Sequence, residues 1–143
     1  MLVDANILLY AVDADSPFHD RAREWLTEAL NGAQRVGLPW MSLWAFLRIA
    51  TNPRASLNPL SPAHAWGHIE EWLDAPAAWV PAPGSGHRRL LQKLVIERDL
   101  RAGLVSDAAL AAICLEHGLA IVSADSDFAR FPDLRWINPL VAG

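Results

Sequence analysis

Acidic residues follow short apolar runs near both ends of the chain. Asp4 comes directly after an apolar start, Asp125 and Asp127 come shortly after the run 120–122, and Asp107 follows a turn. A carboxylate at the carboxyl end of a parallel strand points into the crevice where α/β proteins bind ligands. This placement favours a fold that gathers the aspartates at one edge of a sheet. Because hard divalent cations take oxygen ligands, the gathered carboxylates predict a cation site.

Helical segments separate the strand-like runs. Ser16 and Ser61 each precede a proline, which is the signature of a helix N-cap followed by its first helical position. Ser106 is expected to cap a late helix that presents Asp107 on its inner face, and Trp66 is expected on the buried face of a middle helix. Strands are predicted at 1–3, 35–38, 79–80, 119–122 and 134–137. Strands alternating with helices imply right-handed crossovers and a parallel sheet covered on both faces, an α/β fold.

Size and composition indicate one folded domain over residues 1–143. The chain is 52% hydrophobic, which excludes a disordered chain. Its one cysteine, Cys114, excludes an intrachain disulfide and fits a cytoplasmic protein. We expect neither a signal peptide nor a membrane span. The net charge of −4 argues against a passive nucleic-acid binder, but not against an enzyme whose acidic cluster holds a cation.

Taken singly, the acidic motifs have simpler explanations. Asp4 suits the N-cap of a helix, and Asp107 suits the first helical turn, where the helix dipole favours a carboxylate. The segment 123–128 suits a turn stabilised by its own side chains. A basic cluster, His87 to Arg89 with Lys93, is open to two explanations: it follows an RNA backbone, or it is a solvated helix face.

The motifs taken together resemble a known family. The chain is similar to the PIN-domain nucleases, particularly the VapC-type toxins of bacterial and archaeal toxin–antitoxin pairs. This resemblance implies a PIN-like three-layer α/β/α sandwich with a central, mainly parallel sheet. It also implies a Mg²⁺- or Mn²⁺-dependent endoribonuclease that forms a homodimer and binds an antitoxin protein. The matching segments are Met1–Asn6, Leu47–Arg54, Val105–Ala108, Ile121–Phe128 and Phe131–Trp136.

The resemblance also implies roles for individual residues. Asp4 and Asp107 correspond to the family's metal ligands, and Asp125 corresponds to its late-strand aspartate, with Asp127 close by. Asn6 and Ser123 are expected to support these ligands. In the mechanism that follows, the cation activates a water that attacks an RNA phosphate, and Asp125 positions the water or takes its proton.

One position departs from the family pattern. The family commonly has a glutamate in its third helix, and the matching position here is interpreted as Phe46. No acidic residue occurs between Asn31 and Pro62. Whether one or two metals bind therefore stays open, and an alternative function is a catalytically weakened protein that binds RNA or antitoxin. Arg48, two residues on, either contacts phosphate or is a surface residue.

Overall fold

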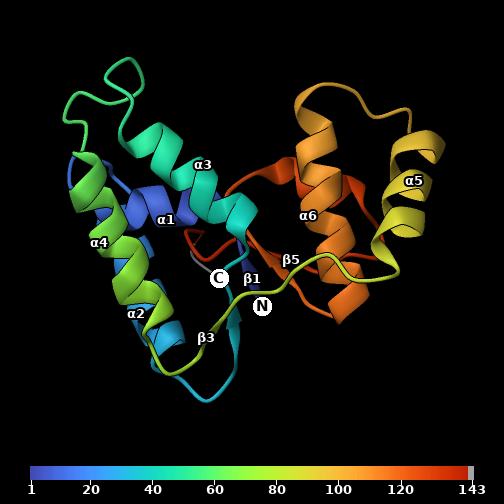
Figure 1. Cartoon of the computed structure of the whole chain (residues 1–143), viewed down its shortest axis with the longest axis horizontal. Coiled ribbons are helices and arrows are strands. Elements are labelled where there is room, and N and C mark those ends of the chain that lie inside the picture. Colours follow the sequence, from blue (N-terminus) through green and yellow to red (C-terminus); the bar gives the residue numbers. More distant parts are fainter. Residues whose placement is uncertain (142–143) are drawn as a thin grey trace.

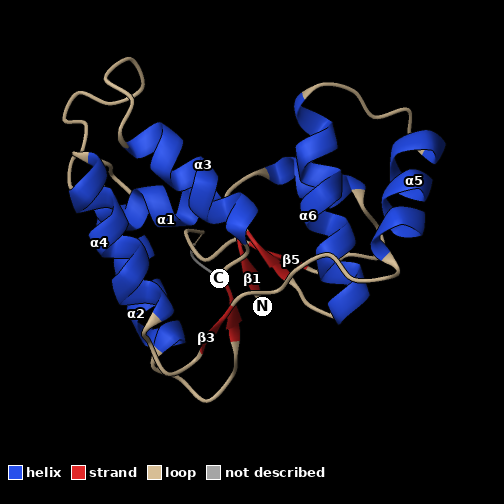
Figure 2. Ribbon diagram, viewed as in Figure 1, coloured by secondary structure: helices blue, strands red, loops and turns tan. Residues whose placement is uncertain are grey.

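A computed structural model describes residues 1–141, and at its centre lies a five-stranded sheet (Figure 2). All four strand pairs are parallel, and the strand order is β3-β2-β1-β4-β5. The strands are β1 (Leu2–Val3), β2 (Val36–Gly37), β3 (Ala78–Trp79), β4 (Ile121–Val122) and β5 (Trp136–Ile137). The predicted strands are confirmed: four are shorter than expected, and β3 has the expected length but begins one residue earlier.

The two central strands show why the sheet is covered on both faces. Successive side chains of a strand point to opposite faces. Leu2 and Ile121 accordingly belong to one buried cluster, and their neighbours Val3 and Val122 belong to a second. All four side chains are fully buried. Each face therefore needs its own layer of helices, as strands with consecutive apolar residues predict.

Helices form the two outer layers (Figure 1). Four of them pack on the face of Val3: α1 (Ala5–Val12), α2 (His19–Leu30), α3 (Trp40–Ala50) and α4 (Pro62–Leu73). On the face of Leu2 lie α5 (His87–Glu97), α6 (Gly103–His117) and the short 3₁₀ helix η1 (Ser126–Arg130). The predicted three-layer α/β/α sandwich is confirmed. None of the helices within residues 1–141 is both long and apolar enough to cross a membrane.

Three local predictions were wrong. Helix α2 begins at His19, because Ser16 uses its hydroxyl and its carbonyl in a tight turn that precedes the helix. Helix α6 begins at Gly103, so Ser106 is an exposed residue of its first turn rather than its cap. Trp66 is 43% exposed and stacks on Trp40 of α3 instead of entering the core.

The order of the strands reverses between β1 and β4. The chain runs outward from β1 to β2 and β3, and then returns to the other side of β1 to form β4 and β5. Ligands of open α/β sheets bind at such a reversal, beyond the carboxyl ends of the strands. Val3 is paired with Val122, so the next residues, Asp4 and Ser123, emerge side by side at this edge.

Candidate metal centre at the carboxyl edge of the sheet

Asp4 stands at the junction of β1 and α1. Its Oδ1 accepts a hydrogen bond from the backbone N–H of Ala5 at 2.8 Å, so Asp4 does cap α1. Its Oδ2 accepts from the hydroxyl of Ser123 at 2.7 Å and from the side-chain amide of Asn6 at 3.2 Å. The cap therefore fixes one carboxylate oxygen and leaves the other turned toward the end of β4.

Ser123 joins the two central strands at this edge. Besides donating to Asp4, its hydroxyl accepts from the side-chain amide of Asn6 at 3.0 Å and from the backbone N–H of Asp125 at 3.0 Å. Asn6 in turn accepts from the backbone N–H of Ala124 at 3.1 Å. Ser123 is fully buried, and this network satisfies its polar side chain. The predicted supporting pair, Asn6 and Ser123, is thus brought into contact with both acidic segments.

Asp107 reaches the same edge from helix α6. The residues three, four and seven positions later, Leu110, Ala111 and Cys114, are buried against the sheet. Because these positions share one helix face, Asp107 lies on the inner face as well, one turn before the core begins. Its side chain is half-buried.

Three half-buried carboxylates come close enough to share a cation. One oxygen each from Asp107, Asp125 and Asp127 lies within 4.8 Å of the other two. Asp125 accepts from the backbone N–H of Asp127 at 2.9 Å, which sets the turn into η1. Asp4 lies outside this triplet and borders it through Ser123. The donors are all oxygens, so the set fits a hard divalent cation such as Mg²⁺ or Mn²⁺.

The electrostatics of the carboxylates also favour a cation. Burial is the main cause that raises the pKa of Asp107 to about 6, and repulsion from Asp125, Asp4 and Asp127 adds to it. Burial likewise raises the pKa of Asp4, against the opposing effect of its hydrogen bond from Ser123. Crowded acidic groups resist ionisation unless a positive charge joins them.

Arg130 is a neighbour of the cluster that the sequence analysis missed. Its guanidinium lies 3.3 Å from Asp127, three residues earlier in η1, and it acts against the rise in the pKa of Asp107. The spacing of opposite charges three residues apart was the available signal. Trp136 was also missed; its indole N–H donates to the carbonyl oxygen of Ser123 at 2.9 Å.

The two singled-out residues of α3 lie elsewhere. Phe46 is fully buried in the helical core and packs edge-on against Trp72 of α4, with 4.8 Å between ring centroids. Position 46 is therefore a core position that does not face the acidic edge. Arg48 is exposed in the last turn of α3, and its side chain makes no hydrogen bond or ion pair within residues 1–141.

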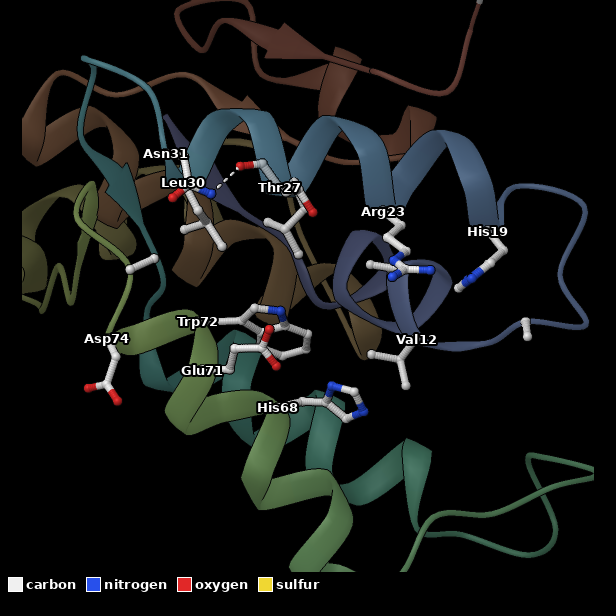
Figure 3. A pocket seen from close by; sticks show the side chains of 14 residues that line it. Val12, His19, Arg23, Thr27, Leu30, Asn31, His68, Glu71, Trp72 and Asp74 are labelled. Carbon is white, nitrogen blue, oxygen red and sulfur yellow. Dashed lines mark hydrogen bonds between the residues drawn. The ribbon is translucent and has the colours of Figure 1, made fainter.

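A separate groove lies between α2 and α4. Figure 3 shows His68, Glu71 and Trp72 of α4 facing Arg23 and Thr27 of α2 across it. The groove reaches Ala11 and Val12, at the opposite end of α1 from Asp4. An eight-residue helix spans about 12 Å, so the groove and the acidic cluster are distinct sites.

Comparisons with known proteins agree with this architecture. The PIN domain family profile matches residues 1–134. The curated relative "Ribonuclease VapC37" of Mycobacterium tuberculosis (strain ATCC 25618 / H37Rv) is 44% identical over 138 residues, which cover 96% of each chain. The chain therefore belongs to the PIN-domain family and, within it, to the VapC-type ribonucleases, as the sequence motifs predicted.

Solved structures with low sequence identity share the fold. One is the crystal structure of VapBC2 from Rickettsia felis bound to a DNA fragment from their promoter. It gives a TM-score of 0.68 at 13% identity and covers 96% of each chain. Another is Mycobacterium tuberculosis VapC20, described as a Sarcin-Ricin loop cleaving toxin, with a TM-score of 0.67 at 15% identity. This match covers 90% of our chain and 92% of VapC20.

Proposed function

We propose that this protein is a metal-dependent endoribonuclease and the toxin of a toxin–antitoxin pair. Asp107, Asp125 and Asp127 would hold Mg²⁺ or Mn²⁺, with Asp4 completing the site. The observation that carries the proposal is the convergence of the three carboxylate oxygens within 4.8 Å at the carboxyl edge of the sheet. The ribonuclease activity named for its VapC-type relatives supports RNA as the substrate.

The residues around the cation site have distinct tasks in this proposal. When bound, the cation would supply charge to the scissile phosphate and to an attacking water. Asp125 orients that water or accepts its proton, since its Oδ2 has no hydrogen-bond partner within the described residues whereas its Oδ1 is held by Asp127. Ser123 and Asn6 keep Asp4 oriented, because supporting hydrogen bonds fix the direction of ligands.

The proposal is tested by cleavage of a labelled single-stranded RNA by the purified chain. Mg²⁺ or Mn²⁺ is expected to support cleavage, and excess EDTA to abolish it. Asp4→Asn should remove most activity while the melting temperature stays close to wild type. Cleavage that continues undiminished in EDTA would rule out the metal-dependent mechanism.

One observation favours a second candidate, a weakened enzyme that acts by binding RNA or antitoxin. Helix α3 brings no carboxylate to the site, and its Phe46 is core. This alternative predicts RNA binding without turnover. Multiple-turnover cleavage by the wild-type chain at micromolar concentration would exclude it.

We further propose an antitoxin partner and a homodimer, in the cytoplasm where RNA substrates occur. Antitoxin complexes among proteins with the same fold, such as VapBC2, support the antitoxin partner. Exposed tryptophans on α3 and α4 offer surface for the dimer: Trp40 is 41%, Trp44 65% and Trp66 43% exposed. We expect a segment of the antitoxin to cover the acidic site. Light scattering that gives only monomer at micromolar concentration would contradict the dimer.

A further inference from the structure

Positive charge is concentrated in helix α5 and the residue that follows it. Residues 87–98 carry four cations, Arg88, Arg89, Lys93 and Arg98, against one acid, Glu97, so their net charge is +3. The whole chain has a net charge of −4, which leaves −7 for the remainder. A local excess of this size on an acidic protein is an electrostatic footprint for an anionic partner.

The cations of α5 contribute little to the fold. Helix α5 has no buried residue and packs mainly on α6. The ion pairs within residues 1–141 are Arg101 with Asp99 and Arg130 with Asp127, and neither involves α5. Arg89 and Lys93 lie one turn apart, where like charges repel and disfavour the helix. Together with Arg88 they line a shallow hollow on the surface of α5.

The C-terminal end of α5 is tied to the acidic cluster. The guanidinium of Arg98 donates to the carbonyl oxygen of Arg130 at 2.7 Å, and the side chain of Arg130 lies 3.3 Å from Asp127. With a rise of 1.5 Å per residue, Arg89 lies about 13 Å along the helix from Arg98. Figure 1 shows α5 beside α6 at the outer side of the molecule, away from α2 and α4. The basic residues therefore extend outward from the candidate metal centre.

We propose that this basic surface, made of Arg88, Arg89, Lys93 and Arg98, binds the phosphodiester backbone of single-stranded RNA next to the cut. The inference rests on the proposed ribonuclease function. Basic surfaces hold single strands through their phosphates, and α5 has no Phe, Tyr or Trp on which bases could stack. The surface therefore contributes affinity without sequence preference. Its continuity with the acidic cluster, where the scissile phosphate must lie, favours RNA over an acidic protein segment.

The test compares two double variants that each remove two positive charges from the full-length chain. Arg89→Gln/Lys93→Gln changes the α5 surface, and Arg23→Gln/Arg54→Gln changes exposed cations remote from it. We expect the α5 variant to raise KM for a 20-nucleotide single-stranded RNA roughly five- to tenfold, with kcat within about twofold of wild type. In an Asp107→Asn background that prevents cleavage, the slope of log affinity against log salt should fall by about 1.4, since each phosphate contact on a single strand contributes about 0.7.

The outcomes separate this inference from the proposed function. If wild type does not cleave RNA, the proposed function fails whatever the variants do. If wild type cleaves and both double variants give the same KM and salt slope, the α5 surface does not bind RNA. A lower kcat together with a lower melting temperature would mean that the cations act on the fold. Displacement of RNA by a polyglutamate peptide as effective as unlabelled RNA would overturn the assignment to RNA.

Discussion

Helices α3 and α6 approach the same edge of the sheet but contribute differently to it. Helix α6 brings Asp107, one turn after its start, toward Asp125 and Asp127. Helix α3 brings Ser42, whose hydroxyl donates to the carbonyl oxygen of Val3, and Phe46, which is core. The carboxylates thus converge from β1, from the β4–η1 turn and from α6, while α3 holds the sheet. Removing the carboxylate of α6 should therefore impair the site, whereas changing a core position of α3 should affect only the stability of the fold.

Phe46→Glu should give the largest effect and a purely structural one. A carboxylate at a fully buried position without a partner is expected to cost at least about 3 kcal/mol of unfolding free energy. Phe46→Leu, which keeps the site apolar, should cost about 1 kcal/mol. Denaturant unfolding measures the unfolding free energy of both variants. A Phe46→Glu protein that is as stable as wild type and binds Mn²⁺ more tightly would contradict the claim that α3 contributes only core packing at this position.

Ala45→Glu tests whether a different face of α3 can reach the metal centre. Met41 packs against the cluster that contains α6, and Ala45 lies one turn later on that helix face, half-buried. We expect Ala45→Glu to tighten Mn²⁺ binding in a calorimetric titration with little loss of stability. Weaker or unchanged Mn²⁺ affinity would show that no position on this face of α3 reaches the site.

Asp107→Asn should lower the rate of RNA cleavage at least about 100-fold. Removing a residue that merely supports a metal ligand already lowers metal affinity or activity about 10- to 100-fold. The fold should persist, since the side chain lies beyond the buried stretch of α6. Asp133→Asn changes an exposed aspartate outside the cluster and serves as the matched control. Equal activity of the two variants would show that Asp107 is not part of the metal centre.

The metal's effect on stability should depend on pH. Between the ordinary aspartate value of 3.8 and the raised pKa of about 6, native Asp107 holds a proton that the unfolded chain has lost. The stability of the metal-free protein therefore falls as pH rises through this window, while cation binding, which needs the carboxylate, strengthens. The rise in melting temperature caused by Mn²⁺ should be larger at pH 7 than at pH 5. An equal rise at both pH values would contradict this, and Asp107→Asn should reduce the difference.

Helices α3 and α6 also begin differently, and a change at the start of α6 should have the smallest effect of these variants on stability. Helix α3 begins after Pro39, whose extended backbone suits the position, whereas α6 begins after Ala102 at φ 52°. This conformation is strained for a residue with a side chain and free for glycine. We expect Ala102→Gly to raise the unfolding free energy by about 1 kcal/mol. A loss of stability on thermal melting would show that the strain is not stored there.

Local patterns were enough to predict the strands and the acidic edge. An apolar run followed by Asp4 or by Ser123 determines where a strand ends, and parallel pairing then brings those ends together. The start of α6 was missed because it depends on the strained Ala102, which no cap motif announces. The sequence left open whether Phe46 is core, because adjacent helix positions differ by about 100° in direction and packing against α4 decides which one is buried. Arg130 was missed although its spacing from Asp127 is local.

The most direct test of the account is the anomalous diffraction signal of Mn²⁺ in crystals of the wild-type chain. We predict a peak between Asp107, Asp125 and Asp127, with their carboxylate oxygens as ligands and the Asp4 side of the site adjoining it. The peak should disappear in Asp107→Asn crystals grown under the same conditions. A Mn²⁺ peak bound elsewhere, with none at the carboxyl edge of β1 and β4, would contradict the claim that these carboxylates form the metal centre.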